Sequence, residues 1–276
     1  MSISEAQKYQ TFSKSLHESE VSLILGDIAI IGMSCVFPKA ENIDTYWQNI
    51  ISKVDAIIDV PADRWDTETF FDPDPNAEEY LHCKRGGYLP ASISFNPLAH
   101  GVMPVVLEGA EPDQFLLLQL VHDALEDAGC SNKIDGKRTE IIAGKGNYLG
   151  AGHANLIQRR IVAEQTIGII QDLHPEYTDD ELRAIKRELL EGLRNFNSET
   201  APSLVPNITT GRVSNRLDFM GPNYTVDAAC ASSLIATDLA VKDLLTKKCD
   251  LAIVGGVHIC NDLPFLMLFE ALHAVS

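Results

Sequence analysis

The sequence is poor in positive charge: its 276 residues include 22 Lys and Arg against 39 Asp and Glu, and the formal net charge is −17. Phosphate recognition relies on clustered Lys and Arg, so this balance argues against a nucleic-acid-binding protein. No run approaches the roughly 18 apolar residues of a membrane-spanning helix, and the first residues lack the apolar stretch of a signal peptide. We therefore expect a cytoplasmic protein without a membrane span.

Metal-like cysteine spacing is also missing. The six cysteines form no Cys-x-x-Cys pair and keep no metal-like spacing with histidine, so we expect no metal site. In a reducing compartment they stay free thiols, and no disulfide framework is implied. The cysteines are Cys35, Cys83, Cys130, Cys230, Cys249 and Cys260.

Two common motif classes fail on inspection. The glycine-rich run 144–152, GKGNYLGAG, has Leu149 where a dinucleotide fingerprint needs its third glycine. It also has Gly146 where a P-loop needs Ser or Thr after the lysine. The sequence contains no G-x-S-x-G elbow either, so a serine hydrolase has no nucleophile. We expect neither a nucleotide cofactor nor serine-hydrolase chemistry.

What is present is the pattern of a globular α/β protein. The composition, 45% hydrophobic and 22% charged, is ordinary for a folded domain. Strand-like and helix-like segments alternate along the chain, which favours a sheet covered by helices. The predicted strands are 28–31, 140–143, 224–227 and 251–254, and the predicted helices are 45–51, 114–128 and 231–245.

One cysteine lies where a nucleophile would be built. In the segment 223–234, NYTVDAACASSL, Cys230 falls between a β-prone run and a helix with apolar residues on one face. Unpaired N–H groups and the positive end of the dipole stabilise negative charge at a helix N-terminus. These features favour a thiolate and an oxyanion there. On this pattern alone Cys230 is either a nucleophile or a small buried residue.

The segment 211–233, GRVSNRLDFMGPNYTVDAACASS, resembles the active-site signature of β-ketoacyl synthases, in particular ketosynthase domains of polyketide and polyunsaturated fatty acid synthases. Further segments are similar to that family in the same order. They are 27–38 (DIAIIGMSCVFP), 60–66 (VPADRWD), 111–129 (EPDQFLLL through ALEDAG) and 249–256 (CDLAIVGG).

The resemblance implies the fold and the chemistry. The fold would be the thiolase-like layered α/β/α/β/α arrangement, its first half plus the beginning of the remainder. Cys230 would take an acyl group and then undergo decarboxylative Claisen condensation with a malonyl-type extender. The substrates would be phosphopantetheine thioesters on an acyl carrier protein, with no other cofactor. The partners implied are that carrier, a second copy in a homodimer, and other domains of the same assembly line.

The resemblance also implies that the sequence is a ketosynthase N-terminal region. The family's two catalytic histidines and a lysine lie far beyond the cysteine, whereas 46 residues follow Cys230 here (276 minus 230). We expect residues 27–276 to form this region, preceded by an extension or linker at 1–26. We also expect an inserted helical segment at about 150–206, whose helix starts with the capping box TDDE at 178–181. The 276 residues alone should not condense.

Phe265 and Phe269 fall where the family lines its acyl channel, with core packing as the alternative. A net charge of −17 disfavours docking of an acidic carrier protein, so docking would need a local basic patch such as Lys242, Lys247 and Lys248. Two other functions stay open. One is a CoA-dependent condensing enzyme of the thiolase or chalcone-synthase kind, and the other is a non-catalytic partner subunit.

Overall fold

A three-stranded parallel sheet lies at the centre of the protein. The computed structural model describes residues 28–74, 76–77, 79–90, 93–130, 134–146, 150–193, 197–259 and 262–275. The sheet has the order β4-β3-β5, from β3 (Thr139–Gly144), β4 (Asn223–Val226) and β5 (Leu251–Gly256). The register sets Gly144 opposite both Val226 and Gly256. All three strands therefore end at one edge.

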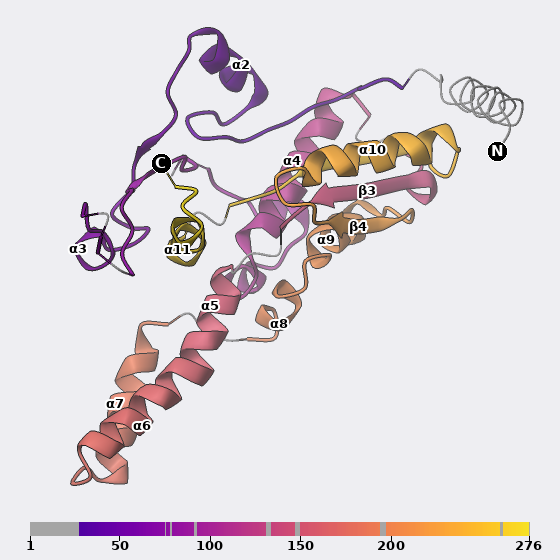
Figure 1. The fold of residues 1–276 in the computed structure, drawn as a ribbon. Helices are drawn as coiled ribbons and strands as arrows, with labels where there is room; N and C mark the ends of the chain where they lie inside the picture. The colour runs from indigo at the N-terminus through magenta and orange to yellow at the C-terminus, as the bar shows by residue number, and fades with distance from the viewer. Residues whose placement is uncertain are drawn as a thin grey trace, which may run out of the picture.

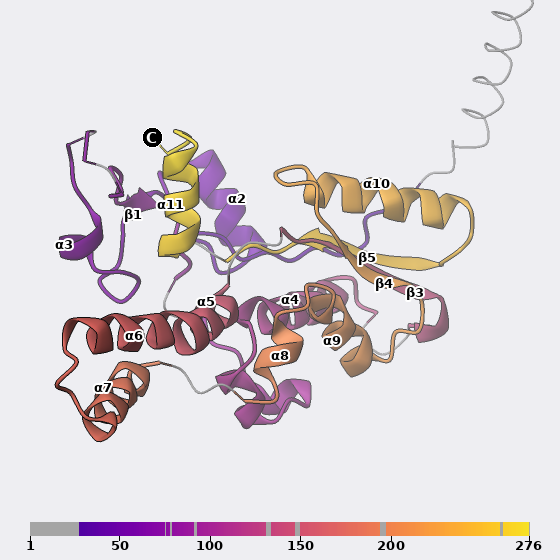
Figure 2. The same ribbon diagram turned by 60° about the horizontal axis from the view of Figure 1, so that its bottom comes forward.

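Helices cover both faces of this sheet (Figures 1 and 2). Helix α10 (Ser232–Leu245) lies on one face, where Ile142 packs against Ala236 and Ala240. Helices α4 (Pro112–Asp127) and α9 (Ile208–Leu217) lie on the other, in a cluster that includes Ile141 and Ala143. Successive residues of β3 thus point to opposite faces, as in any strand. The predicted α/β class with a covered sheet is confirmed.

The long helix α4 supplies the larger core. Its residues Phe115, Leu118, Val121 and Leu125 recur every three or four positions and are buried together. Pro112 occupies the first helical turn, where its missing N–H has no intrahelical partner to lose. The helix ends before Gly129, whose φ of +64° suits glycine.

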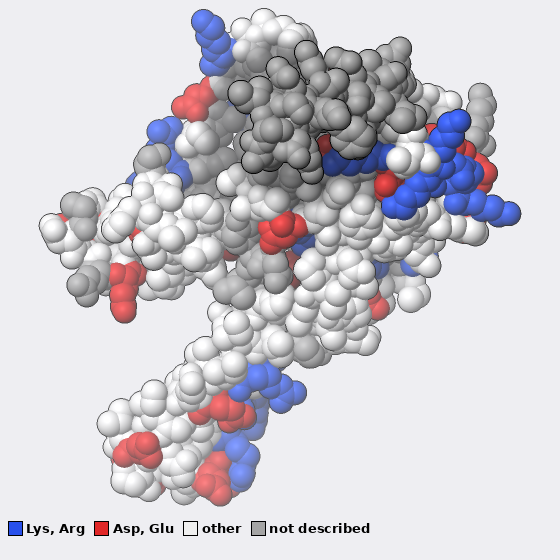
Figure 3. Space-filling view, turned by 45° about the vertical axis from the view of Figure 1, so that its right-hand side comes forward, with Lys and Arg blue, Asp and Glu red and all other residues white. Residues whose placement is uncertain are grey.

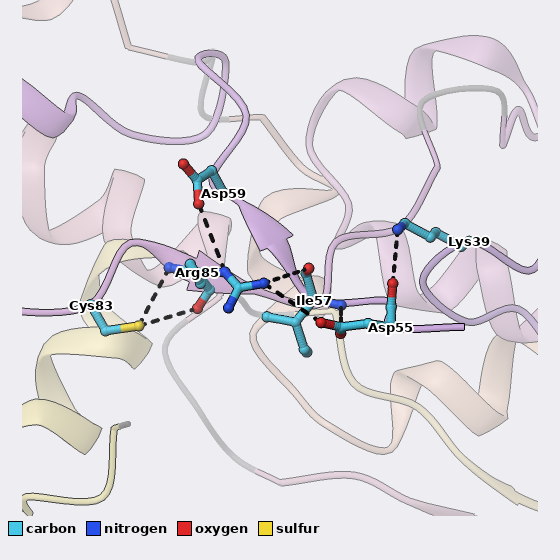
Figure 4. A network of polar contacts seen from close by, with 6 residues as sticks. All are labelled: Lys39, Asp55, Ile57, Asp59, Cys83 and Arg85. Carbon is cyan, nitrogen blue, oxygen red and sulfur yellow. Dashed lines mark hydrogen bonds and ion pairs between the residues drawn. The ribbon is translucent and has the colours of Figure 1, made fainter. Parts of the chain in front are cut away.

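A small antiparallel pair lies apart from the central sheet. It consists of β1 (Ile58–Asp59) and β2 (Arg85–Gly86). The Arg85 guanidinium donates to the Ile57 carbonyl at 3.2 Å and lies 3.7–3.8 Å from carboxylates of Asp55 and Asp59 (Figure 4). These groups are exposed, so the contacts orient the loops more than they stabilise them. Nearby lie α2 (Ile43–Ile51), α3 (Thr67–Phe70), and the short helices η1 (Leu98–His100), η2 (Pro104–Glu108) and η3 (Gly136–Arg138).

A helical arm projects from the body (Figure 1). Helix α5 (Ala151–Ile157) continues through a π-helical turn, η4 (Gln158–Val162), into α6 (Ala163–Leu173), and α7 (Asp179–Glu191) returns alongside α6. The Lys186–Glu164 ion pair joins α6 to α7, and Arg159 donates to the Leu193 carbonyl at 2.6 Å. A short helix, α8 (Thr200–Ser203), leads back to α9.

The predicted capping box in this arm is confirmed. The Thr178 hydroxyl accepts the Glu181 N–H, and the Glu181 carboxylate accepts the Thr178 N–H. The continuous helix that precedes it was not predicted. Sequence reasoning had stopped at the glycine-rich run, where 147–149 lie outside the described residues.

The predicted strand at 28–31 is wrong. This segment is extended but pairs with no strand of the described chain. It crosses α4 instead: the Met33 N–H donates to the Asp127 carboxylate at 2.8 Å, and the Ser34 hydroxyl donates to the Leu120 carbonyl at 2.6 Å. The proposed extension at 1–26 lies outside the described residues. Among the helices described, none is both long and apolar enough to cross a bilayer.

Candidate active site

Cys230 lies in the tight turn that joins strand β4 to helix α10. Strand β4 ends at Val226 and α10 begins at Ser232, so the turn emerges at the carboxyl edge of the sheet. Ala229, directly before the cysteine, has a φ of +49°. Such an angle is strained for a residue other than glycine. The turn leaves Cys230 exposed at the N-terminal end of a 14-residue helix.

A single buried hydroxyl bridges the two sides of this turn. The Ser232 Oγ accepts the Ala228 N–H at 2.8 Å and donates to the Ala229 carbonyl at 2.6 Å. Ser232 is 6% exposed, so water has little access to these bonds. Outside the turn, the Ala229 N–H donates to the exposed Asp227 carboxylate at 3.0 Å. Sequence reasoning missed Ser232, because its role depends on the backbone shape at Ala229.

Two glycines form the floor below the turn. A Cβ on Gly144 would lie 2.6 Å from the Ser232 carbonyl carbon and 2.6 Å from the Ser233 nitrogen. A Cβ on Gly256 would lie 3.0 Å from the Ser233 Cβ. The start of α10 therefore rests directly on the ends of β3 and β5. The motif 249–256 ends in this contact.

A buried ion pair lies beside the end of the nucleophile strand. The Lys145 N–H donates to the Val226 carbonyl at 3.0 Å, and its ammonium pairs with the Asp113 carboxylate. The same ammonium donates to the Thr209 hydroxyl at 3.0 Å. Lys145 thus ties β3 to α4 and α9. The sequence showed this lysine only as part of a failed P-loop, since its partners are distant along the chain.

Phe265 and Phe269 lie on helix α11 (Leu263–Ala271) with their ring centroids 4.6 Å apart. Both are half-buried, and the Phe265 ring lies 4.8 Å from the ring of His258. These residues and Cys230 line the same open hollow of about 2820 Å³. The structure thus brings all three predicted site residues to one concave surface.

Cys230 differs from the other described cysteines by its exposure. Cys35, Cys83 and Cys130 are half-buried and Cys249 is buried, while Cys260 lies outside the described residues. Burial raises the pKa of the Cys35 thiol. Burial, with the Glu140 carboxylate beside it, raises the pKa of the Cys249 thiol to about 12. Of the described thiols, Cys230 is the one most open to a substrate.

The glycine-rich run does not form a phosphate cradle in its described part. The Glu111 carboxylate accepts the Gly152 N–H at 2.7 Å, and a Cβ on Gly150 would meet the same carboxylate at 2.7 Å. A negative charge already occupies the start of α5. Elsewhere, His122, Asp123 and Glu126 offer ligand atoms within 4.8 Å of one another on α4. Such exposed acidic groups are common without a metal, and nothing else described points to an ion there.

A covered parallel sheet that presents an exposed cysteine on a strained strand-to-helix turn defines an α/β protein with a nucleophile site. Comparison with known families supports this class and narrows it. Residues 26–276 match the family described as "Beta-ketoacyl synthase, N-terminal domain". The chain therefore belongs to the β-ketoacyl synthase family.

Its relatives are ketosynthase-containing synthases. The chain is 32% identical to the polyketide synthase PksN of Bacillus subtilis over 232 residues, which are 84% of this chain and 4% of that protein. It is 28% identical to a polyunsaturated fatty acid synthase of a Thraustochytrium species over 245 residues, 88% of this chain and 8% of that one. The chain thus spans a small part of the length of these relatives.

Solved structures agree. The oxazolomycin ketosynthase domain OzmH KS7 of Streptomyces albus matches with a TM-score of 0.66 and 28% identity, covering 89% of this chain and 37% of that one. A ketosynthase from module 6 of the bacillaene synthase of Bacillus subtilis matches with a TM-score of 0.63 and 26% identity, covering 90% and 34%. The predicted thiolase-like layered fold is confirmed.

Proposed function

We propose that this chain is the region of a β-ketoacyl synthase that carries the growing acyl group on Cys230. The observation that carries the proposal is the exposed thiol on the strained turn at the N-terminus of α10, facing the hollow that α11 also lines. Residues 27–276 would form the ketosynthase region, with the helical arm as an insertion at about 150–206.

The loading step uses groups around the turn. The Cys230 thiolate attacks the carbonyl carbon of an acyl thioester, forming a new S–C bond and an oxyanion. Backbone N–H groups at the start of α10 are suited to stabilise that oxyanion. The oxyanion then collapses, the old thioester bond breaks, and the phosphopantetheine thiolate leaves with its electron pair. The acyl group remains on Cys230.

Condensation would follow with a malonyl-type extender that loses carbon dioxide to give the attacking carbanion. The family resemblance assigns that half-reaction to two histidines and a lysine outside these 276 residues. We therefore expect the 276-residue chain alone to form no ketoacyl product. Loss of one general acid–base partner already costs about 10²–10⁴-fold in rate.

Phe265 and Phe269 would line the channel for the acyl chain. Their paired, half-buried rings present an apolar wall to the hollow. If Phe265 faces the acyl chain, a smaller residue at this position should admit longer chains. A Phe265→Ala variant whose acyl-length profile is unchanged would contradict this assignment.

An acyl carrier protein would deliver the substrate, so that phosphopantetheine thioesters are the donors and no other cofactor is needed. The basic patch suggested for docking has little free charge. Lys242 pairs with Asp238 at 2.6 Å and Lys248 with Asp243 at 2.6 Å. This patch also lies at the far end of α10 from Cys230, a helix about 21 Å long at 1.5 Å per residue. Of these lysines, Lys247 is the better docking candidate.

A homodimer would form through β4. This strand is an edge of the sheet within the described chain, and an open edge must be paired or covered. A symmetric contact satisfies both edges at once. Thr225→Asp or Val226→Asp should give monomer or aggregate by light scattering, because a carboxylate would be buried without a partner. Thr166→Asp in the arm is the matched control. A Thr225→Asp protein that stays dimeric and loads normally would place the contact elsewhere.

The central test is acyl loading of the full-length protein. Incubation with an acyl thioester and peptide mass spectrometry should place the adduct on Cys230, and Cys230→Ala should abolish it, whereas Cys83→Ala should not. An adduct on Cys35 or Cys260 would overturn the assignment. Comparing carrier-protein and CoA thioesters as donors separates a ketosynthase from a CoA-dependent condensing enzyme. Absence of any adduct would favour a non-catalytic partner subunit.

A further inference from the structure

We infer that Ser232 is a positioning residue for acyl transfer: its hydroxyl holds the turn in the shape that presents Cys230 to the thioester. The inference rests on the proposed function of Cys230. It starts from one atom, Ser232 Oγ, which bonds to the backbone on both sides of the strained Ala229.

The strain at Ala229 gives the hydroxyl something to hold. A positive φ is unfavourable for alanine, so the turn persists only if the surrounding structure enforces it. Ser232 Oγ fixes the N–H that precedes Ala229 and the carbonyl that follows the same φ angle. Cys230 is the next residue along the chain, so its direction follows from this angle.

The other hydrogen bond at the turn is easier to replace. The Ala229 N–H reaches the carboxylate of Asp227, an exposed residue, where water can substitute for the carboxylate. Ser232 is buried, so water is poorly placed to take over its two bonds. Losing the hydroxyl therefore frees the turn, whereas changing an exposed neighbour does not.

The sheet fixes the height of the same serine. Gly144 lies so close below that a Cβ there would come within 2.9 Å of the Ser232 Cβ. The serine is thus held from below by β3 and tied sideways to the turn by its hydroxyl. These two restraints set the place of the first helical turn, whose N–H groups face the reacting carbonyl in the proposed step.

Ser233 provides a matched control. It is the adjacent residue of the same type, it is exposed, and within the described chain its hydroxyl makes no hydrogen bond. Ser232→Ala and Ser233→Ala remove the same atom one position apart. A difference between the two variants reports the two bonds of Ser232 and not the general loss of a hydroxyl near the site.

The measurement is the rate of acyl loading on Cys230 in the full-length protein, as a function of acyl-thioester concentration. Ser232→Ala should slow loading about tenfold at saturating donor, leave the half-saturating concentration unchanged, and still reach full occupancy. Ser233→Ala should load like the unmodified protein. Partial unfolding would instead lower the fraction of protein that loads, without slowing the remainder.

A second variant covers the case in which Ser232→Ala folds poorly. Glycine accepts a positive φ without strain, so Ala229→Gly combined with Ser232→Ala should fold better yet still load slowly, because the turn is free. Full recovery of the loading rate in this double variant would overturn the inference, as would equal rates for Ser232→Ala and Ser233→Ala. If the unmodified protein does not load at Cys230, the proposed function fails first and the inference fails with it.

Discussion

Two cysteines flank helix α10, and the protein treats them in opposite ways. Cys230 precedes the helix and is exposed, whereas Cys249 follows it and is 2% exposed. Burial and the Glu140 carboxylate raise the pKa of Cys249 to about 12, which keeps that thiol protonated. The comparison shows that the residue type alone says little about reactivity. Access and neighbouring charge decide it.

The surroundings of the two ends differ in the same sense. The N-terminal end of α10 is packed on glycines and held by the hydroxyl of Ser232. The C-terminal end carries ion pairs, Lys248 with Asp243 and Arg138 with Asp250, each at 2.6 Å. Blue and red surfaces are interleaved over this part of the molecule in Figure 3. Shape is fixed at one end, and charge is balanced at the other.

The largest expected effect is on alkylation. At pH 8 a thiol with a pKa of about 12 is ionised to about 10⁻⁴, and its burial limits access further. Cys249 should therefore react with iodoacetamide at least about a thousandfold more slowly than Cys230. Peptide mass spectrometry over a time course measures both rates in the same sample.

Unfolding the protein in urea provides the control for this experiment. Both thiols should then react at similar rates, since the fold creates the difference. Comparable rates in the folded protein would remove the contrast between the two ends of α10. It would also show that Cys249 is more open than the structure indicates.

The next effect is on stability at the glycine floor. Gly144→Ala would drive a methyl group into the backbone of Ser232 and Ser233, so we expect a loss of about 1–3 kcal/mol in the free energy of unfolding. Gly168→Ala is the control. It lies on the exposed α6 with nothing within 4 Å of the added carbon, and alanine there should stabilise the helix by about 0.5–1 kcal/mol.

Urea unfolding of the two variants measures both changes. Opposite signs would confirm that Gly144 is needed for close approach of α10 to the sheet. A neutral Gly144→Ala would mean that the start of the helix can shift, and that the turn at Cys230 is less tightly fixed than its contacts suggest.

Local sequence patterns predicted the elements whose signals are local. The capping box at Thr178 was found because both partners lie within four residues. Strands β3 and β5 were found from short apolar runs. The segment 28–31 carries the same kind of run, yet it lies over α4, and Gly32 is there because a Cβ would meet the Ala124 carbonyl at 2.2 Å. An apolar run does not say which element it will pack against.

The candidate site divides in the same way. Cys230 could be identified from its position before a helix and from the motif around it. Ser232, Lys145 and Glu140 could not, because their roles come from the fold. Ser232 acts through the angle at Ala229, Lys145 pairs with Asp113 from another helix, and Glu140 becomes buried only when α10 covers β3.

The smallest expected effect tests Glu140, the neighbour of Cys249. This side chain is fully buried, and neither carboxyl oxygen has a well-formed hydrogen bond among the described residues. Burial raises the pKa of its carboxyl from an ordinary 4.5 to about 6, and the nearby Asp243 adds to the rise. The folded protein therefore favours the protonated acid, in contrast to a carboxylate held in a salt bridge.

The sign of the pH dependence follows from that rise. Because the folded pKa lies above the unfolded one, the contribution of Glu140 to stability is fully present below about pH 4.5 and is lost as pH rises through about 6. Glu140→Gln removes this titration without adding charge. Relative to the unmodified protein, the variant should gain about 1–2 kcal/mol between pH 4.5 and 7 and stay level above that. Urea unfolding at several pH values measures the difference. A difference that is constant with pH would show that Glu140 is ionised at its ordinary pKa, and the low reactivity expected for Cys249 would then rest on burial alone.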